Sequence, residues 1–252
     1  MINFVGAGAG AADLITVRGA KLLEKADVII YAGSLVNPEL LNYAKDDCKI
    51  YNSAQMTLEE VISVMLDAEE NGLATVRLHT GDPAIYGAIR EQMDILDKNG
   101  VEYAVCPGVS SMFGAAAALK AEFTLPDVSQ SVIVTRMEGR TPVPPKESIE
   151  SFAAHKATMV IFLSAGMTKE LSKRLIDGGY APETPAAIVY KATWDDEKVL
   201  KTTVENLHKT AEENGITKTA LILVGEFLGD KYDRSKLYDP DFSHLFREGK
   251  KD

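Results

Sequence analysis

The chain has 252 residues, of which 46% are hydrophobic and 25% charged, and its 37 acidic and 27 basic side chains give a formal net charge of −10. This ordinary globular composition suits one large domain or two small ones, and the acidic balance argues against a general nucleic-acid binder. Two cysteines exclude a disulfide framework, and no apolar run approaches the roughly 20 residues of a membrane helix, so we expect a cytoplasmic protein without a membrane segment.

Strands and helices alternate through the first half of the chain. An apolar strand at residues 2–5 ends in a glycine cluster, and a helix follows at residues 14–25. Strands at 28–31, 73–78 and 101–105 then alternate with helices that open at Thr57, run over residues 85–96 and run over residues 110–119. Thr57 and Glu60 form a predicted capping box. The alternation predicts an α/β fold with a largely parallel sheet.

The alternation of strands and helices is interrupted at residues 121–129 and then resumes. Strands are predicted at 131–134, 159–163, 186–190 and 220–224, with helices at 148–155, 168–177 and 204–214. An extra strand at residues 198–203 would make this second sheet mixed. We therefore expect an N-terminal α/β domain over residues 1–121, a C-terminal α/β domain over residues 129–230, and a tail over residues 231–252.

The first candidate motif, Gly6-Ala7-Gly8-Ala9-Gly10-Ala11, follows a strand and precedes a helix. It matches the fingerprint of a dinucleotide site, which would make the protein an NAD(P)-dependent reductase. That fingerprint requires an acidic residue at the end of the second strand, but Asp27 stands at the start of that strand. A tight turn of small residues, against which another group packs closely, is the simpler interpretation.

Two further glycine loops follow predicted strands. Gly81-Asp82-Pro83 comes after one strand and Pro107-Gly108 after the next, and both lead into helices. The plain interpretation is that Asp82 and Ser110 cap those helices. Because ligands of open α/β sheets bind outside the carboxyl ends of the strands, three glycine loops at one edge favour a ligand site.

These segments together resemble the tetrapyrrole (corrin/porphyrin) methyltransferases, which use S-adenosylmethionine. The matching residues are Val5-Gly6-Ala7-Gly8, Asp13-Leu14-Ile15-Thr16, Arg18-Gly19, Gly81-Asp82-Pro83, Tyr86-Gly87, Pro107-Gly108-Val109-Ser110 and Val224-Gly225-Glu226. The resemblance spans about residues 1–228. Within the family, residues 78–83 and 135–144 are most similar to the branch that methylates C11 of precorrin-4, or of its cobalt form, in cobalamin synthesis.

The resemblance implies two α/β domains with a cofactor cleft between them, and a homodimer. It places the cofactor contacts at Gly81, Asp82, Pro83, Tyr86, Ser110, Ser111, Leu163 and Ala192. The first loop departs from the family pattern, because Ala9 replaces a common proline and Ala11 a common acidic residue. We expect this to make the loop more flexible.

Transfer of a sulfonium methyl requires orientation rather than a metal or a covalent nucleophile, because the methyl is already electrophilic. The histidines show no ligand spacing; they are His79, His155, His208 and His244. The catalytic residue is unidentified. Asp82 is a candidate base, and a scaffolding role in the cofactor loop is the alternative.

A tetrapyrrole substrate carries several carboxylates, for which arginine is the best bidentate donor. We expect Arg136 and Arg140 to bind them. For Arg77 and Arg90, surface ion pairing is the alternative, and for Lys120 it is an interaction with the helix dipole. Gly8, Tyr31 and Ser34 would line the substrate trough, although Tyr31 is as readily a core residue.

The predicted function is therefore a methyltransferase that moves a methyl group from S-adenosylmethionine to C11 of precorrin-4 or cobalt-precorrin-4, releasing S-adenosylhomocysteine. Methylation of another precorrin or of uroporphyrinogen III is the nearest alternative. A nicotinamide-dependent reductase and a ligand sensor without catalysis are alternatives of other classes. The sequence does not decide whether the substrate holds cobalt.

Overall fold

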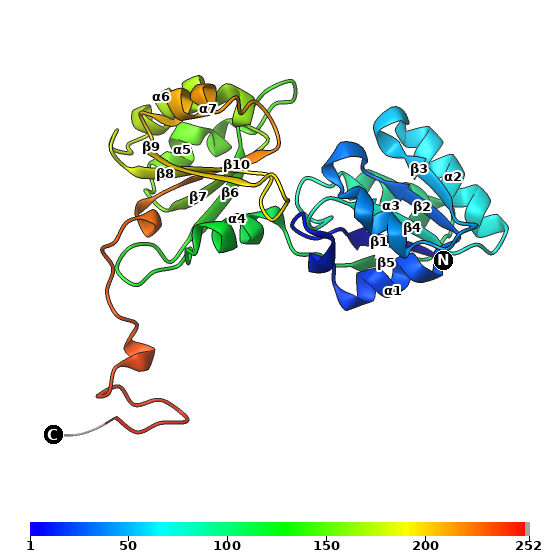
Figure 1. Cartoon of the computed structure of the whole chain (residues 1–252), viewed down its shortest axis with the longest axis horizontal. Coiled ribbons are helices and arrows are strands. Elements are labelled where there is room, and N and C mark those ends of the chain that lie inside the picture. The colour runs from blue at the N-terminus through cyan, green and yellow to red at the C-terminus, as the bar shows by residue number, and fades with distance from the viewer. Residues whose placement is uncertain (250–252) are drawn as a thin grey trace. The chain divides into compact units, whose positions relative to one another are not determined.

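A computed structural model describes residues 1–249, with the side chain of Ser34 excepted. It divides into two compact units, Met1–Ala115 with Ala192–Asp196, and Ala116–Lys191 with the residues from Glu197 onward. The sequence places the boundary at residues 121–129, whereas the structure divides the chain earlier, between Ala115 and Ala116. Each unit holds one five-stranded sheet together with helices (Figure 1), so the predicted α/β class is confirmed.

The sheet of the first unit is parallel throughout. Its strands are β1 (Ile2–Gly6), β2 (Val28–Tyr31), β3 (Lys49–Asn52), β4 (Thr75–His79) and β5 (Tyr103–Cys106), in the order β3-β2-β4-β1-β5. The sequence analysis missed β3, an edge strand whose residues Lys49 and Ile50 are exposed. Because β4, β1 and β5 are parallel neighbours, their carboxyl ends lie at one edge.

Four helices belong to this part of the chain: α1 (Val17–Lys25), α2 (Leu58–Glu70), α3 (Ile89–Lys98) and α4 (Ser111–Leu119), the last of which crosses the division between the units. The predicted capping box of α2 is present. Two helices begin later than predicted. Thr16 caps α1 by accepting a hydrogen bond from the N–H of Gly19, and Ala88 before α3 has a left-handed backbone with φ 49°.

The sheet of the second unit is mixed. Its strands are β6 (Val132–Arg136), β7 (Thr158–Phe162), β8 (Pro185–Tyr190), β9 (Lys198–Thr203) and β10 (Ala220–Val224), in the order β6-β7-β10-β8-β9. Only β6 and β7 pair in parallel. The expected extra strand is β9. The helices are α5 (Ile149–Ala153), α6 (Thr168–Asp177) and α7 (Leu207–Glu213).

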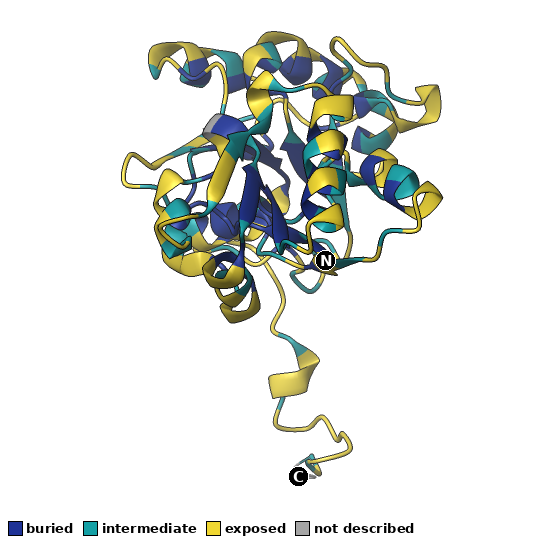
Figure 2. Ribbon diagram, turned by 90° about the vertical axis from the view of Figure 1, so that its right-hand side faces the viewer, coloured by how far each residue is buried: buried dark blue, intermediate teal, exposed yellow. Residues whose placement is uncertain are grey.

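Each sheet is sealed by apolar side chains. One face of the first sheet packs Phe4 and Ile30 against Met65 of α2, and the other packs Ile29 against Leu23 of α1. In the second unit, residues of β7, β8 and β10 pack against α5, α6 and α7. Figure 2 shows the buried strands in dark blue and the exposed outer sides of the helices in yellow. Burial on both faces fixes the strands and therefore the loops that leave them.

Residues 231–249 form the tail and contribute no strand to either sheet. Their large side chains stay exposed, Leu245 at 90% and Phe246 at 89%. Within the described residues, no helix is both long and apolar enough to cross a membrane.

Candidate functional site

The loops after β1 and β4 are joined by their backbones. The N–H of Ala7 donates to the carbonyl of His79 at 2.7 Å, and the N–H groups of Gly8 and Gly81 each donate to the other's carbonyl, at 3.3 and 3.1 Å. This pairing continues beyond the parallel strands as an isolated antiparallel bridge. The predicted meeting of these loops at one edge is therefore present.

The loop after β5 reaches the same place. A Cβ added to Gly6 would lie 2.6 Å from the Cα of Gly108 and 2.6 Å from the carbonyl oxygen of Gly81. A Cβ on Gly108 would also collide with the carbonyl oxygen of Gly81. We call Gly6, Gly8, Gly81 and Gly108 the glycine crossing. At Gly6 and Gly108 the backbones of the three loops are packed so closely that no Cβ fits between them.

Asp82 ties two of these loops together. Its Oδ2 accepts a hydrogen bond from the N–H of Gly108 at 2.9 Å, and its Oδ1 accepts one from the N–H of Ala84 at 2.8 Å. Hydrogen bonds that end on an ionised group are among the stronger ones. Because both carboxylate oxygens are already engaged, the geometry favours the scaffolding role of Asp82 over that of a base.

The segment after Asp82 has a strained backbone. Tyr86 and Ala88 have φ values of 55° and 49°, in the left-handed region that side chains other than glycine rarely adopt. Tyr86 is 47% exposed. Such strain is concentrated at functional sites in proteins. Pro83, which begins this segment, is buried beside the crossing.

Ser110 and Ser111 lie at the start of α4, against the crossing. A Cβ on Gly81 would lie 3.4 Å from the backbone nitrogen of Ser111 and 3.5 Å from the Cα of Ser110. Ser110 is 5% exposed, and its hydroxyl accepts a long hydrogen bond of 3.5 Å from the N–H of Met112. Ser110 therefore caps α4, as the plain interpretation has it, and it also lies at the edge of the site.

The first glycine loop is held tightly by residues Ala192–Asp196, which belong to the same unit. The N–H of Ala11 donates to Oγ1 of Thr193 at 2.9 Å. Ala9 is 6% exposed, and a Cβ on Gly114 of α4 would lie 2.9 Å from its Cβ. Small residues at positions 9 and 11 thus permit close packing, and the structure gives no support to the expected extra flexibility. Ala192, a predicted cofactor contact, is buried in this packing.

Beneath the crossing lie two buried basic side chains of β4. Arg77 donates from Nε to Oε1 of Gln92 at 3.2 Å and from Nη1 to the carbonyl of Ile30 at 3.1 Å, and Gln92 donates to the carbonyl of Ala88 at 2.9 Å. Burial lowers the pKa of Arg77 to about 10. Burial, together with the charge of Arg77, lowers the pKa of His79 to about 3. Arg77 is therefore a buried anchor of the turn before α3, and neither a surface ion pair nor an exposed substrate contact.

In the second unit, Leu163 follows β7. Its side chain is 65% exposed and its φ is 53°, so a large apolar residue is held outward in a strained conformation. Its neighbour Ser164 accepts a hydrogen bond at Oγ from the N–H of Met137 at 2.9 Å. The loops after β6 and β7 are thereby joined.

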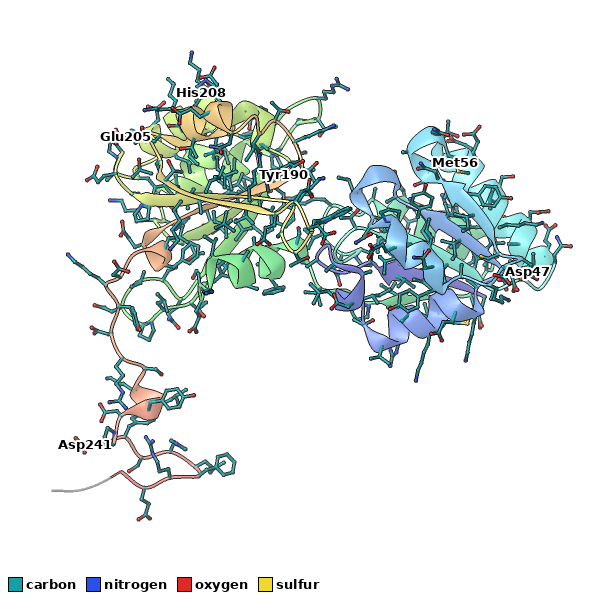
Figure 3. The ribbon with its side chains drawn as sticks, viewed as in Figure 1. Asp47, Met56, Tyr190, Glu205, His208 and Asp241 are labelled. Carbon is teal, nitrogen blue, oxygen red and sulfur yellow. The ribbon has the colours of Figure 1, made fainter. Side chains whose placement is uncertain are left out.

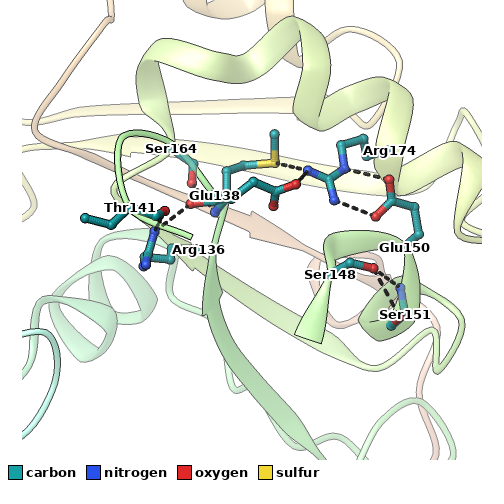
Figure 4. Close-up of polar contacts among 9 residues, drawn as sticks. Arg136, Glu138, Thr141, Ser148, Glu150, Ser151, Ser164 and Arg174 are labelled. Atoms are coloured by element: carbon teal, nitrogen blue, oxygen red, sulfur yellow. Dashed lines mark hydrogen bonds and ion pairs between the residues drawn. The ribbon is translucent and has the colours of Figure 1, made fainter. Parts of the chain in front are cut away.

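Arg136 and Arg140 have different surroundings. The guanidinium of Arg136 donates to the carbonyls of Met137, Thr141 and Pro142 at 3.1, 3.2 and 2.8 Å. Arg140 lies exposed on the same loop. The sequence assigns both to substrate carboxylates, but the structure directs the donors of Arg136 into its own loop (Figure 4).

The remaining predicted substrate contacts are spread over the first unit. Gly8 is buried in the glycine crossing, and the half-buried Tyr31 packs against an apolar cluster, as the core alternative has it. The side chain of Ser34 lies outside the described residues. Arg90 pairs with Asp94 at 2.6 Å, which is the surface ion pair given as its alternative. Lys120 is exposed just after α4.

Among residues 1–249, no group of three or more His, Cys, Asp or Glu side chains could hold a metal ion. His208 lies on α7 (Figure 3), and its Nδ1 shares a hydrogen bond of 3.2 Å with the hydroxyl of Thr168.

Residues 1–208 match the family model described as tetrapyrrole (corrin/porphyrin) methylases. The chain is a member of this family. The methylase is 56% identical over 251 residues to a protein of Methanocaldococcus jannaschii named cobalt-precorrin-4 C(11)-methyltransferase, a match that covers 99% of this chain and 97% of the relative.

Solved structures agree with this assignment. A cobalamin biosynthetic enzyme described as cobalt precorrin-4 methyltransferase matches the methylase with a TM-score of 0.89 and 49% identity, over 91% of this chain and 96% of that one. Uroporphyrin-III C-methyltransferase from Thermus thermophilus, complexed with S-adenosylhomocysteine, matches with a TM-score of 0.74 and 25% identity, over 90% and 93% of the two chains.

Proposed function

We propose that this methylase transfers a methyl group from S-adenosylmethionine to C11 of cobalt-precorrin-4 in cobalamin biosynthesis. The observation that carries the proposal is the similarity to a relative of that name along 99% of the chain. The structural neighbour at a TM-score of 0.89 is likewise described as acting on cobalt precorrin-4. These names favour the cobalt form of the substrate, which the sequence alone leaves open.

We infer that the cofactor binds at the edge built by the glycine crossing. The backbone of residues 81–83, the segment of Tyr86 and the start of α4 at Ser110 and Ser111 surround this edge. Closely packed glycine backbones let a flat ligand approach the main chain. Tyr86, exposed although its backbone is strained, offers an aromatic surface to such a ligand. Ala192 in the first unit and Leu163 in the second remain proposed contacts.

When bound, S-adenosylmethionine supplies an electrophilic methyl group. The protein must hold that group in line with the accepting carbon, because an error of about an ångström in position is costly. The glycine crossing and the Asp82 hydrogen bonds fix the loops that would do so. Asp82 thus acts in this proposal through positioning and takes no proton.

The nicotinamide alternative fits the structure poorly. It would require a carboxylate at the end of β2 to hold a ribose. Asp27 stands before β2, where it pairs with Lys45 at 2.5 Å and accepts the N–H of Ala74 at 2.7 Å. The carboxylate is therefore committed to a structural contact at the opposite end of the strand.

The location and assembly of the methylase remain proposals. Cys48 and Cys106 are both free, which supports work in the reducing cytoplasm. We keep the homodimer that the family resemblance implies, and we expect no nucleic-acid partner, since the net charge is −10.

The test uses purified protein, S-adenosylmethionine with a labelled methyl group, and a panel of cobalt-precorrin-4, precorrin-4 and uroporphyrinogen III. NMR of the product should locate the label at C11 of cobalt-precorrin-4. Calorimetry should show micromolar-scale binding of S-adenosylhomocysteine and none of NADH. Label at another carbon, or turnover of uroporphyrinogen III alone, would refute the C11 assignment, and a preference for NADH would refute the methyltransferase.

A further inference from the structure

The loop after β6 is shaped from within by one arginine. Arg136 ends β6, and its guanidinium donates to three carbonyls of the chain that follows, those of Met137, Thr141 and Pro142. We call residues 137–144 the arginine loop. The N–H of Gly139 also donates to the carbonyl of Thr141 at 3.2 Å. A flexible loop would not keep one planar donor group facing three carbonyls, so these contacts preform the turn.

The base of the arginine loop is clamped by a second arginine. Arg174 of α6 donates from Nε and Nη2 to the two carboxylate oxygens of Glu150 at 2.6 and 2.7 Å, and from Nη1 to Glu138 at 2.5 Å (Figure 4). The side chain of Arg174 is only 11% exposed. Arg174 thus joins the loop, through Glu138, to α5 and α6.

Both carboxylates of this clamp are held in the charged form. The hydrogen bonds from Arg174 lower the pKa of Glu150 to about 2. The pKa of Glu138 is lowered first by its own backbone N–H and then by Arg174. The clamp is therefore fully ionised at neutral pH, with one guanidinium held between two carboxylates.

The arginine loop also lies beside a proposed cofactor contact. The N–H of Met137 donates to Oγ of Ser164, the residue after the exposed Leu163. Strands β6 and β7 are parallel, with Arg136 opposite Phe162, so their following loops share an edge. Arg140, at the exposed part of the arginine loop, is the cation that this framework presents to solvent at that edge.

We propose that the arginine loop is a preformed recognition element for the carboxylates of the macrocycle, in which Arg140 contacts the substrate and Arg136, Glu138 and Arg174 are positioning residues. This rests on the proposed function, since it assumes a polycarboxylate substrate. It changes the role expected from the sequence for Arg136 and adds Glu138 and Arg174, to which the sequence analysis assigns no role. Preforming the loop lowers the entropic cost of binding.

The experiment compares two variants that each remove one carboxylate from Arg174. Glu138→Gln releases the arginine loop from the clamp, whereas Glu150→Gln leaves the Glu138 contact in place. The two glutamates are similarly exposed, at 42% and 38% of their side chains, and Glu150 makes two hydrogen bonds to Arg174 where Glu138 makes one. Glu150→Gln should therefore destabilise the fold at least as much as Glu138→Gln. The measurements are the KM for cobalt-precorrin-4, the melting temperature and the affinity for S-adenosylhomocysteine.

We expect Glu138→Gln to raise the KM for cobalt-precorrin-4 about tenfold, the loss expected for one charge-assisted contact, while Glu150→Gln leaves it within about twofold. Glu150→Gln should lower the melting temperature at least as much as Glu138→Gln, and both variants should leave the affinity for S-adenosylhomocysteine unchanged. Equal KM values in the two variants would refute the positioning role. A wild-type protein that does not turn over cobalt-precorrin-4 would instead refute the proposed function, and the same comparison would then use the affinity for uroporphyrin III, a stable polycarboxylate tetrapyrrole.

Lysine and alanine substitutions at positions 140 and 136 distinguish a side chain that contacts the substrate from one that positions the loop. Lysine keeps the charge of arginine but not its planar set of donors. Arg140→Lys should therefore retain most of the macrocycle affinity that Arg140→Ala loses. Arg136→Lys should lose as much as Arg136→Ala, because the three carbonyls are bonded by two separate guanidinium nitrogens and lysine has a single donor nitrogen. If lysine restored affinity at position 136 and failed to do so at position 140, the assigned roles would be refuted.

Discussion

The glycine crossing, at the edge of the first sheet, and the arginine loop, at the edge of the second, hold their loops in place in different ways. At the first edge, glycines let three loops come together because they carry no side chain, and Asp82 ties two of these loops through hydrogen bonds. At the second, Arg136 fixes the loop through hydrogen bonds to its carbonyls, and Arg174 holds the loop through its contact with Glu138. In the proposed site, the glycine crossing would present main chain to the cofactor, whereas the arginine loop would present the side chain of Arg140 to the substrate.

This difference predicts different sensitivities to mutation. Within the glycine crossing, Gly6 and Gly108 have no room for an added Cβ, because the backbones of the neighbouring loops already touch there. We expect the arginine loop to accept side chains of other sizes, but not substitutions that remove the hydrogen bonds made by Arg136 or by Glu138. This difference is also the reason why we propose the first edge for the cofactor, which must come close to the main chain, and the second for the substrate carboxylates.

The largest expected effect comes from adding a methyl group to the crossing. Gly108→Ala forces a Cβ against the carbonyl oxygen of Gly81, and overpacking of this kind costs about 1–3 kcal/mol or more. We expect calorimetry to show binding of S-adenosylhomocysteine weakened about a hundredfold.

The matched control is Gly100→Ala. Gly100 has a φ of 67°, and an added Cβ would meet nothing within 4 Å. It therefore tests backbone strain without a collision and should leave cofactor affinity unchanged. Equal losses in the two variants would show that the crossing has no special role.

Removing the tie between the loops should have a smaller effect. Asp82→Ala leaves the N–H groups of Gly108 and Ala84 without their acceptor, and we expect about a tenfold loss of affinity for S-adenosylhomocysteine. Asp82→Asn, which keeps one acceptor oxygen, should fall between Asp82→Ala and the wild type. The dependence of kcat on pH should keep its shape in Asp82→Asn, and a lost ionisation there would establish Asp82 as a base instead.

The last prediction concerns stability in acid, which is measured by unfolding rather than by binding. The folded pKa of His79, about 3, lies below the ordinary value of 6.5, so between these values the unfolded chain binds a proton that the folded chain does not. Stability is therefore retained above pH 6.5 and lost as the pH falls toward 3, by at most about 1.4 kcal/mol per pH unit. Urea unfolding of His79→Gln should show a shallower loss between pH 6.5 and 5, and the same slope as the wild type between pH 7 and 8. An unchanged slope below pH 6.5 would contradict burial of His79 in its neutral form.

Much of the first edge could be predicted from the sequence, because its signals are local. Glycines after buried strands, a capping box at Thr57 and Glu60, and the alternation of strands and helices each lie within a few residues of one another. Their meeting follows from the rule that parallel strands end at the same edge. The edge strand β3 was missed because half of it is exposed and carries no apolar pattern.

The second edge could be predicted only in part. The sequence indicates Arg136 and Arg140 but not which of them faces inward, because that depends on the path of the carbonyls between them. Arg174 lies 36 residues from Glu138 and 24 from Glu150, and no spacing rule connects them. At the first edge too, one contact has no local signal: the N–H of Ala11 donates to Thr193, 182 residues away.

The most direct test of the central claim is a crystal structure of the protein with S-adenosylhomocysteine. We predict that the ligand lies against the backbone of residues 81–83 and the start of α4 at Ser110, with the glycine crossing beneath it. Well-defined ligand density anywhere away from those loops would contradict the account.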